Sequence, residues 1–69
     1  MALEELKAVL RYRKVSYREL APVLGVQVST FSRKINEQHG SEFSRSEIVQ
    51  LAEYLHLDHD EVRRLFFAQ

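Results

Sequence analysis

Apolar residues recur along this chain at intervals of three and four positions, the spacing that places them on one face of an α-helix. The first such stripe predicts a helix over about residues 2–13 and consists of Leu3, Leu6, Val9 and Leu10. A later stripe consists of Ile48, Leu51, Ala52 and Leu55. No segment alternates over a useful length with the two-residue period of a β-strand. We therefore expect an all-α fold.

Three segments open with a side chain that can accept hydrogen bonds from free helix amides, followed three positions later by a glutamate that can return one. The pairs are Ser16 with Glu19, Ser44 with Glu47, and Asp58 with Glu61. They predict helices that begin after residues 16, 44 and 58. The last of them is expected to run to about residue 67 and to offer Val62, Leu65 and Phe66 to the core. Phe43, just before the second of these caps, is expected to point inward.

The helix after Ser16 is expected to end at Gly25, because glycine adopts the left-handed conformation of a helix end at little cost. Only Val26 and Gln27 then precede a helix predicted over residues 28–36. Pro22 removes one backbone hydrogen bond from the helix before the turn. Either that helix is kinked at Pro22, or its first turn is irregular and Pro22 lies nearer its true start.

Five helices in 69 residues form one domain, residues 1–69, without a linker or an internal repeat. The chain has no cysteine, so an apolar core must stabilise it without disulfides, alone or with a partner subunit. No apolar run approaches the roughly 18 residues of a membrane span, and the acidic start lacks the pattern of a signal peptide. We expect a soluble protein of the cytoplasm.

The ten basic and ten acidic side chains cancel, but they are distributed unevenly. Residues 1–40 have a net charge of +3 and residues 41–69 a net charge of −3. Between Arg11 and Lys34 there are six basic side chains, opposed only by Glu19. Such a local positive field is compatible with a polyanionic partner, although an ordinary solvated face has the same composition.

Two short helices joined by a tight turn that begins with glycine are the layout of a helix-turn-helix, whose second helix enters the DNA major groove. The apolar residues that would fix the crossing of the two helices are Leu20, Leu24, Val26, Phe31 and Ile35. A polar stripe on the second helix consists of Val28, Ser29, Ser32, Arg33 and Asn36. A solvated helix of a small bundle is the alternative interpretation of the same spacing.

This stripe suits the reading of base pairs. Its two serines are small enough to allow close approach to base edges, and Val28 can contact a thymine methyl group. Arg33 can donate two hydrogen bonds to O6 and N7 of one guanine. Asn36 at the helix end and Arg18 on the preceding helix are placed to bind phosphates.

Residues 16–36 resemble the helix-turn-helix of the phage Cro and repressor family. The shared marks are Glu19-Leu20-Ala21, Leu24-Gly25-Val26 and Ser29-Thr30-Phe31-Ser32-Arg33. The rest of the chain, through Leu65-Phe66-Phe67, is similar to the small single-domain regulators that phages encode. The resemblance implies a five-helix repressor-like fold that binds double-stranded operator DNA in the bacterial cytoplasm or nucleoid.

The resemblance also assigns roles to single residues. The base-reading set is Val28, Ser29 and Arg33, with Gln27 and Ser32 as helpers, and the backbone set is Tyr17 and Asn36, beside Arg18. Tyr17 stands where the family commonly has Gln, and Glu37 and Glu42 follow the predicted reading helix in place of basic residues. We therefore expect modest affinity for one copy, a shallow salt dependence, and a homodimer on half-sites roughly 34 Å apart.

Phe66 and Phe67 are neighbours on the last predicted helix, about 100° apart, so both cannot point into one small core. We expect a hydrophobic dimer interface made by Leu65, Phe66 and Phe67. The alternative is that both rings pack under the first helix.

Other chemistry has little support. His56 and His59 are three positions apart, but they lie on either side of the predicted cap Asp58 and no cysteine accompanies them, which argues against zinc. The chain has no glycine-rich phosphate loop and no carboxylate pair placed to enclose a pocket. We expect no enzymatic activity, cofactor, metal or small-molecule substrate.

These patterns favour a transcriptional regulator of the Cro or repressor type, which reads the major groove with residues 28–36 and represses by occluding an operator. The alternative is a protein–protein interaction module that keeps the helix-turn-helix fold. Such a module would bind another regulator through its C-terminal phenylalanines or its acidic half.

Overall fold

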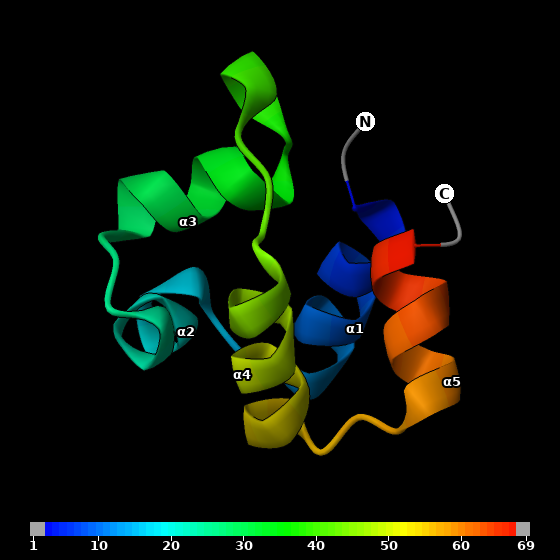
Figure 1. Ribbon diagram of the computed structural model, residues 1–69. Helices are drawn as coiled ribbons and strands as arrows, with labels where there is room; N and C mark the ends of the chain where they lie inside the picture. Colours follow the sequence, from blue (N-terminus) through cyan, green and yellow to red (C-terminus); the bar gives the residue numbers. More distant parts are fainter. Residues whose placement is uncertain (1–2, 68–69) are drawn as a thin grey trace.

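Five α-helices and two short helical turns form residues 3–67, the part of the chain that the computed structural model describes (Figure 1). They are α1 (Glu4–Arg13), α2 (Tyr17–Leu24), α3 (Val28–Ile35), the 3-10 turn η1 (Gln38–Gly40), α4 (Arg45–Leu55), α5 (His59–Val62) and the π-helical turn η2 (Arg63–Phe67). No strand occurs within residues 3–67, which confirms the all-α prediction. None of the helices described is both long and apolar enough to cross a membrane.

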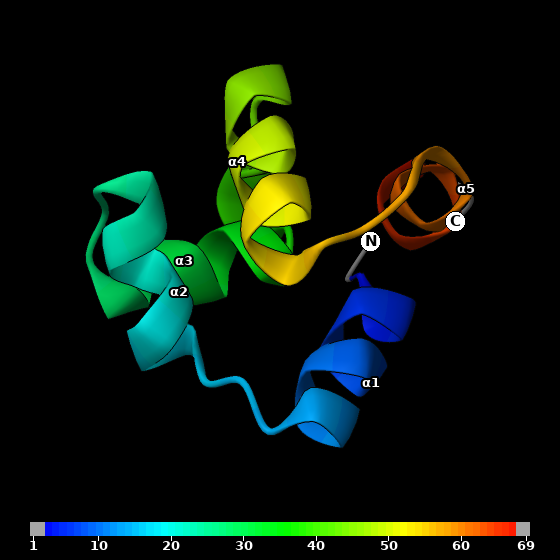
Figure 2. The ribbon, with the colours of Figure 1, turned by 90° about the horizontal axis from the view of Figure 1, so that it is seen from below.

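The central helix is α4. In Figure 1, α2 and α3 lie on one side of it and α1 and α5 on the other. Figure 2, seen from below, shows the same division. α2 packs against both α3 and α4, while α1 packs against η2, so the two ends of the described chain lie close together. The α2–α3 pair therefore forms one flank of the molecule.

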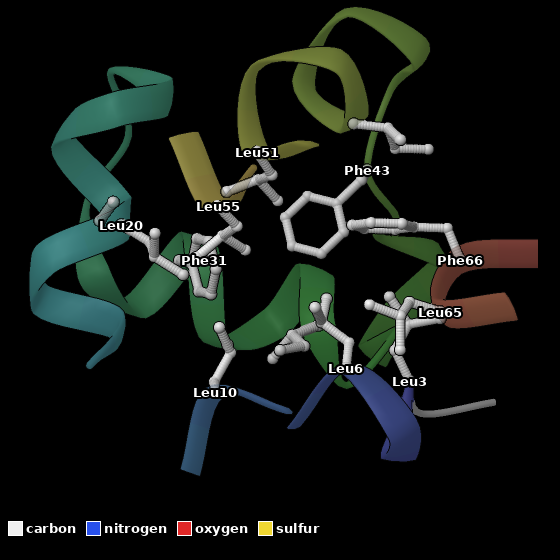
Figure 3. Packing of buried hydrophobic residues seen from close by; sticks show 13 residues of the cluster. Leu3, Leu6, Leu10, Leu20, Phe31, Phe43, Leu51, Leu55, Leu65 and Phe66 are labelled. Carbon is white, nitrogen blue, oxygen red and sulfur yellow. The ribbon is translucent and has the colours of Figure 1, made fainter. Parts of the chain in front are cut away.

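The core is centred on a row of aromatic rings (Figure 3). Phe31 of α3 is fully buried, and its ring centroid lies 5.2 Å from that of Tyr17 and 5.3 Å from that of Phe43. Phe43 in turn meets Phe66 edge to face at 6.1 Å, an arrangement that aromatic pairs prefer. The leucines with almost no exposed surface around this row are Leu6, Leu10, Leu20, Leu51 and Leu65. The prediction that Phe43 points inward is confirmed.

Two of the three predicted capping boxes are complete. The Ser44 hydroxyl accepts a hydrogen bond from the Glu47 amide at 3.3 Å, and the Glu47 carboxylate accepts one from the Ser44 amide at 2.9 Å. Asp58 and Glu61 exchange the same two bonds at 2.8 and 2.9 Å. Each box satisfies amides that would otherwise be unpaired at the start of α4 or α5.

The start of α2 is also capped, because the Ser16 hydroxyl accepts a hydrogen bond from the Glu19 amide at 3.1 Å. With a regular cap at Ser16, the first turn is not displaced towards Pro22, and that alternative is wrong. Pro22 lies inside α2. Its side chain is exposed, and the helix continues past it for two more residues, to Leu24.

The predicted helix over residues 58–67 divides into α5 and η2. In a π-helical turn the backbone bonds span five residues instead of four, which widens the turn. Leu65 and Phe66 are both buried there, against α1 and Phe43, whereas Phe67 is 65% exposed. The predicted interface of Leu65, Phe66 and Phe67 is therefore corrected, since two of its three side chains belong to the core of the single chain and only Phe67 is open to a partner.

Candidate nucleic-acid interface

α2 and α3 are joined by a three-residue turn, residues 25–27, as the sequence predicts. Gly25 adopts the left-handed conformation with φ 70°, and its amide donates to the Pro22 carbonyl at 3.0 Å. The Val26 amide donates to the Ala21 carbonyl at 3.1 Å, which satisfies a second carbonyl at the end of α2. The Gln27 carbonyl accepts the first bond of α3 at 2.9 Å, so the new helix begins at once.

The inner face of α3 is held by packing and by its neighbours. Phe31 and Ile35, four residues apart, have no exposed surface. The Lys34 ammonium lies 3.0 Å from the Glu47 carboxylate and ties α3 to the first turn of α4. At the other end, the Leu3 amide donates to the Ile35 carbonyl at 3.0 Å. These contacts fix the orientation of α3, so its outer face is constrained to face solvent.

That outer face carries the predicted base-reading residues. The exposed members are Gln27, Val28, Ser29 and Arg33, and Ser32 is half-buried between them and the core. Within residues 3–67, the side chains of Ser29 and Arg33 make no hydrogen bond or ion pair. Val28 is 41% exposed although it is apolar. The structure thus brings the five residues together at one surface with their side chains unengaged.

The first turn of α2 adjoins this surface. Arg18 is exposed and its guanidinium has no partner among the residues described. Tyr17 is half-buried, because its ring packs on Phe31. Arg18 is therefore available to a phosphate, while Tyr17 also serves the core.

Asn36 is placed differently from the sequence expectation. Its side-chain oxygen accepts a hydrogen bond from the Lys7 ammonium, and its side-chain nitrogen donates to the Ser32 carbonyl at 2.9 Å. α3 itself ends at Ile35, with Asn36 as its C-cap. The amide that was expected to bind phosphate is instead engaged between α1 and the end of α3. Lys7 is 29 positions away in the chain, and no local pattern indicates the pairing.

One of the cations on α3, Lys34, is paired with a carboxylate of α4. Burial by itself raises the pKa of the Glu47 carboxyl, but the hydrogen bond from the Ser44 amide and the nearby Lys34 charge more than offset this and leave the pKa below its ordinary value. Glu47 is therefore ionised and pairs with Lys34, which removes that cation from the exposed face. Arg18 and Arg33 remain as unpaired cations around the stripe.

The acidic and histidine side chains of residues 3–67 do not form a metal site. Within the described part of the chain, no three His, Asp or Glu side chains gather closely enough to hold a metal ion. His56 takes the left-handed C-cap position of α4 and His59 begins α5.

No protein-family model, no curated protein and no solved structure matches this chain.

Proposed function

We propose that this protein is a sequence-specific DNA-binding regulator of transcription with a repressor-like helix-turn-helix, which places α3 in the major groove. The observation that carries the proposal is the division of α3 into two faces. Phe31 and Ile35 are completely buried on one face of the helix. An unpaired Arg33 lies on the opposite face beside small side chains. An α-helix, about 10–12 Å wide with its side chains, fits a major groove about 12 Å wide.

The exposed residues have complementary roles in such a complex. Arg33 donates two hydrogen bonds to the O6 and N7 atoms of a guanine, a contact worth about 1–3 kcal/mol of discrimination against other bases. Val28 contacts a thymine methyl group, and the Ser29 hydroxyl bonds to a neighbouring base edge. The small size of these two side chains allows the helix backbone to approach the bases closely.

Contacts to the DNA backbone orient the helix. Arg18 binds a phosphate from the first turn of α2, with Tyr17 beside it. Because Lys34 is paired with Glu47 and Asn36 with Lys7, few phosphates are neutralised by one copy. The logarithm of the binding constant then falls by only about 0.9 per contacted phosphate for each unit of log salt. Two copies on adjacent half-sites give the affinity that one copy lacks.

Regulation follows from occupancy alone. A protein bound across a promoter excludes other proteins from the same DNA, so this function requires neither a cofactor nor a catalytic group. Occupancy then depends on the concentration of the regulator itself.

Selection of bound sites from a pool of random duplex DNA at low salt tests the proposal. Wild type should enrich a short motif, and Arg33→Ala should enrich the same motif with relaxed preference at one base pair. Arg63→Ala is the matched control, since it removes an equal charge from the exposed surface of η2 and should leave the motif unchanged. The absence of any enriched motif, with retention lost at moderate salt, would overturn the proposal and favour an interaction module.

A further inference from the structure

A groove between α4 and α5 is not used by the proposed function. It has a volume of about 320 Å³ and is lined by Ile48, Val49, Ala52, Glu53, Leu57, Asp58, His59 and Val62. Most of these side chains are apolar, and Val49 is 50% exposed on its wall. Glu53 and Asp58 are exposed carboxylates, and the lining contains no Lys or Arg. We call this the α4–α5 groove, an apolar hollow with an acidic rim.

A second unused feature is Tyr12 near the end of α1. Its side chain is 89% exposed, because Leu6 and Leu10 occupy the buried face of the same helix. Arg11 and Lys14 beside it are exposed, and neither has a side-chain partner among the residues described. The end of α1 thus presents one aromatic ring and two unpaired cations to solvent.

The two features complement each other in shape and in charge. An aromatic side chain buries about 150–250 Å² when it enters an apolar pocket, and the groove provides such a hollow. Two free cations beside the ring match the two carboxylates on the rim. The same polarity holds for the whole chain, with +3 on residues 1–40 and −3 on residues 41–69. Tyr12 does not fill the groove of its own chain, since it is almost fully exposed.

We propose that Tyr12 of one copy docks into the α4–α5 groove of a second copy, with Arg11 and Lys14 facing Glu53 and Asp58. Each such contact joins the ring of one copy to the groove of the other. A groove-to-groove pair would instead bring like carboxylates together and repel. The residues of the α3 stripe take no part in this contact and stay exposed in both copies.

One ring and its flanking charges bury less than the 1,200 Å² or so of a stable interface, so the contact is weak in free solution. On DNA, copies held on neighbouring sites experience an effective concentration in the millimolar range, at which a weak contact is populated. This consequence rests on the proposed function. It predicts cooperative binding to neighbouring half-sites.

The contact itself is tested without DNA, by sedimentation at concentrations up to about 1 mM, the range in which a weak contact is populated. The ring variant is Tyr12→Ser and the groove variant is Val49→Lys, both at exposed positions, with folding checked by circular dichroism. Wild type should associate, and each variant alone should stay monomeric. A mixture of the two variants should form a one-to-one pair and stop there, because the intact ring of one meets the intact groove of the other.

Phe67→Ser is the control, since it removes an exposed aromatic ring from another surface and should leave association unchanged. Loss of association in this variant alone would assign self-contact to the C-terminus and overturn the proposal. So would a monomeric wild type, association of either single variant as in wild type, or a mixture that fails to pair. None of these outcomes depends on DNA, so they leave the test of the DNA-binding proposal separate.

Discussion

The Tyr54 hydroxyl donates a 2.6 Å hydrogen bond to the Glu19 carboxylate and joins α4 to the first turn of α2 across 35 positions of the chain. Glu19 was expected to return a bond to its own cap, Ser16. Its carboxylate is instead drawn to α4, so the α2–α3 pair is fastened to the central helix at this point as well as through the core. The bond needs a protonated phenol, because a carboxylate can only accept.

The pKa of Tyr54 is raised above its ordinary value, chiefly by the hydrogen bond to Glu19 and also by desolvation and the Glu19 charge. Stability from this link is present at pH values below the ordinary phenol range and is lost as pH rises through the raised pKa of the folded protein. Glu19→Gln should move the titration of Tyr54 to lower pH, as followed by NMR of its ring carbon. An identical titration midpoint in both proteins would show that the bond does not persist in solution.

Phe31→Ala should lower the free energy of unfolding by about 3–5 kcal/mol, since it leaves a cavity where three aromatic rings meet. Phe31→Leu should lower it less, because the smaller cavity retains part of the packing. Val28→Ala on the exposed side of the same helix is the control and should change stability little. Urea denaturation measures all three, and equal effects of Phe31→Ala and Val28→Ala would contradict the packing of α3 described above.

Gly25→Ala should destabilise the fold by about 1–2 kcal/mol, the penalty for placing a Cβ in the left-handed conformation. A Cβ at this position meets no atom within 4 Å, so the loss comes from the backbone and not from a clash. Gly25→Asn should be milder, since asparagine tolerates this conformation better. Thermal denaturation distinguishes them, and a neutral Gly25→Ala would mean that the turn relaxes to another geometry.

Glu47→Gln should lower stability at neutral pH by about 1 kcal/mol, through loss of the pairing with Lys34 and weakening of the cap. Since the pKa of Glu47 is lowered in the folded protein, its contribution is present above the pKa of the unfolded chain and disappears as pH falls through the folded pKa. The difference in unfolding free energy between Glu47→Gln and wild type should therefore become smaller as pH falls. Glu42→Gln, at an exposed position without this pairing, serves as control and should show no such trend.

Local signals predicted much of this fold. The caps at Ser44 and Asp58 and the left-handed Gly25 depend on residues within four positions of one another, so their energetics can be deduced from short stretches of sequence. The burial of Phe31 and Ile35 follows from their spacing once α3 is placed.

Long-range pairings were missed because they have no local signature. Lys7 and Asn36 lie on different elements, and their hydrogen bond turns the Asn36 side chain away from the role that the sequence suggested. Likewise, the division of residues 58–67 into α5 and η2 depends on what the last turn packs against. A regular helix over these residues predicts Leu65 and Phe66 on the core side, which is confirmed, but it does not predict the π-helical turn in which they lie.

The central claim is that α3 reads bases through Arg33, and equilibrium titration of the selected DNA site measures it most directly. Arg33→Ala should weaken binding to that site by about 1–3 kcal/mol. The variant protein should also bind the selected site no more tightly than a site in which the guanine pair has been changed. Arg63→Ala, which removes the same charge elsewhere, should keep both the affinity and the preference. If Arg33→Ala retains the full preference of wild type for the selected site, α3 does not read DNA through this residue and the account is contradicted.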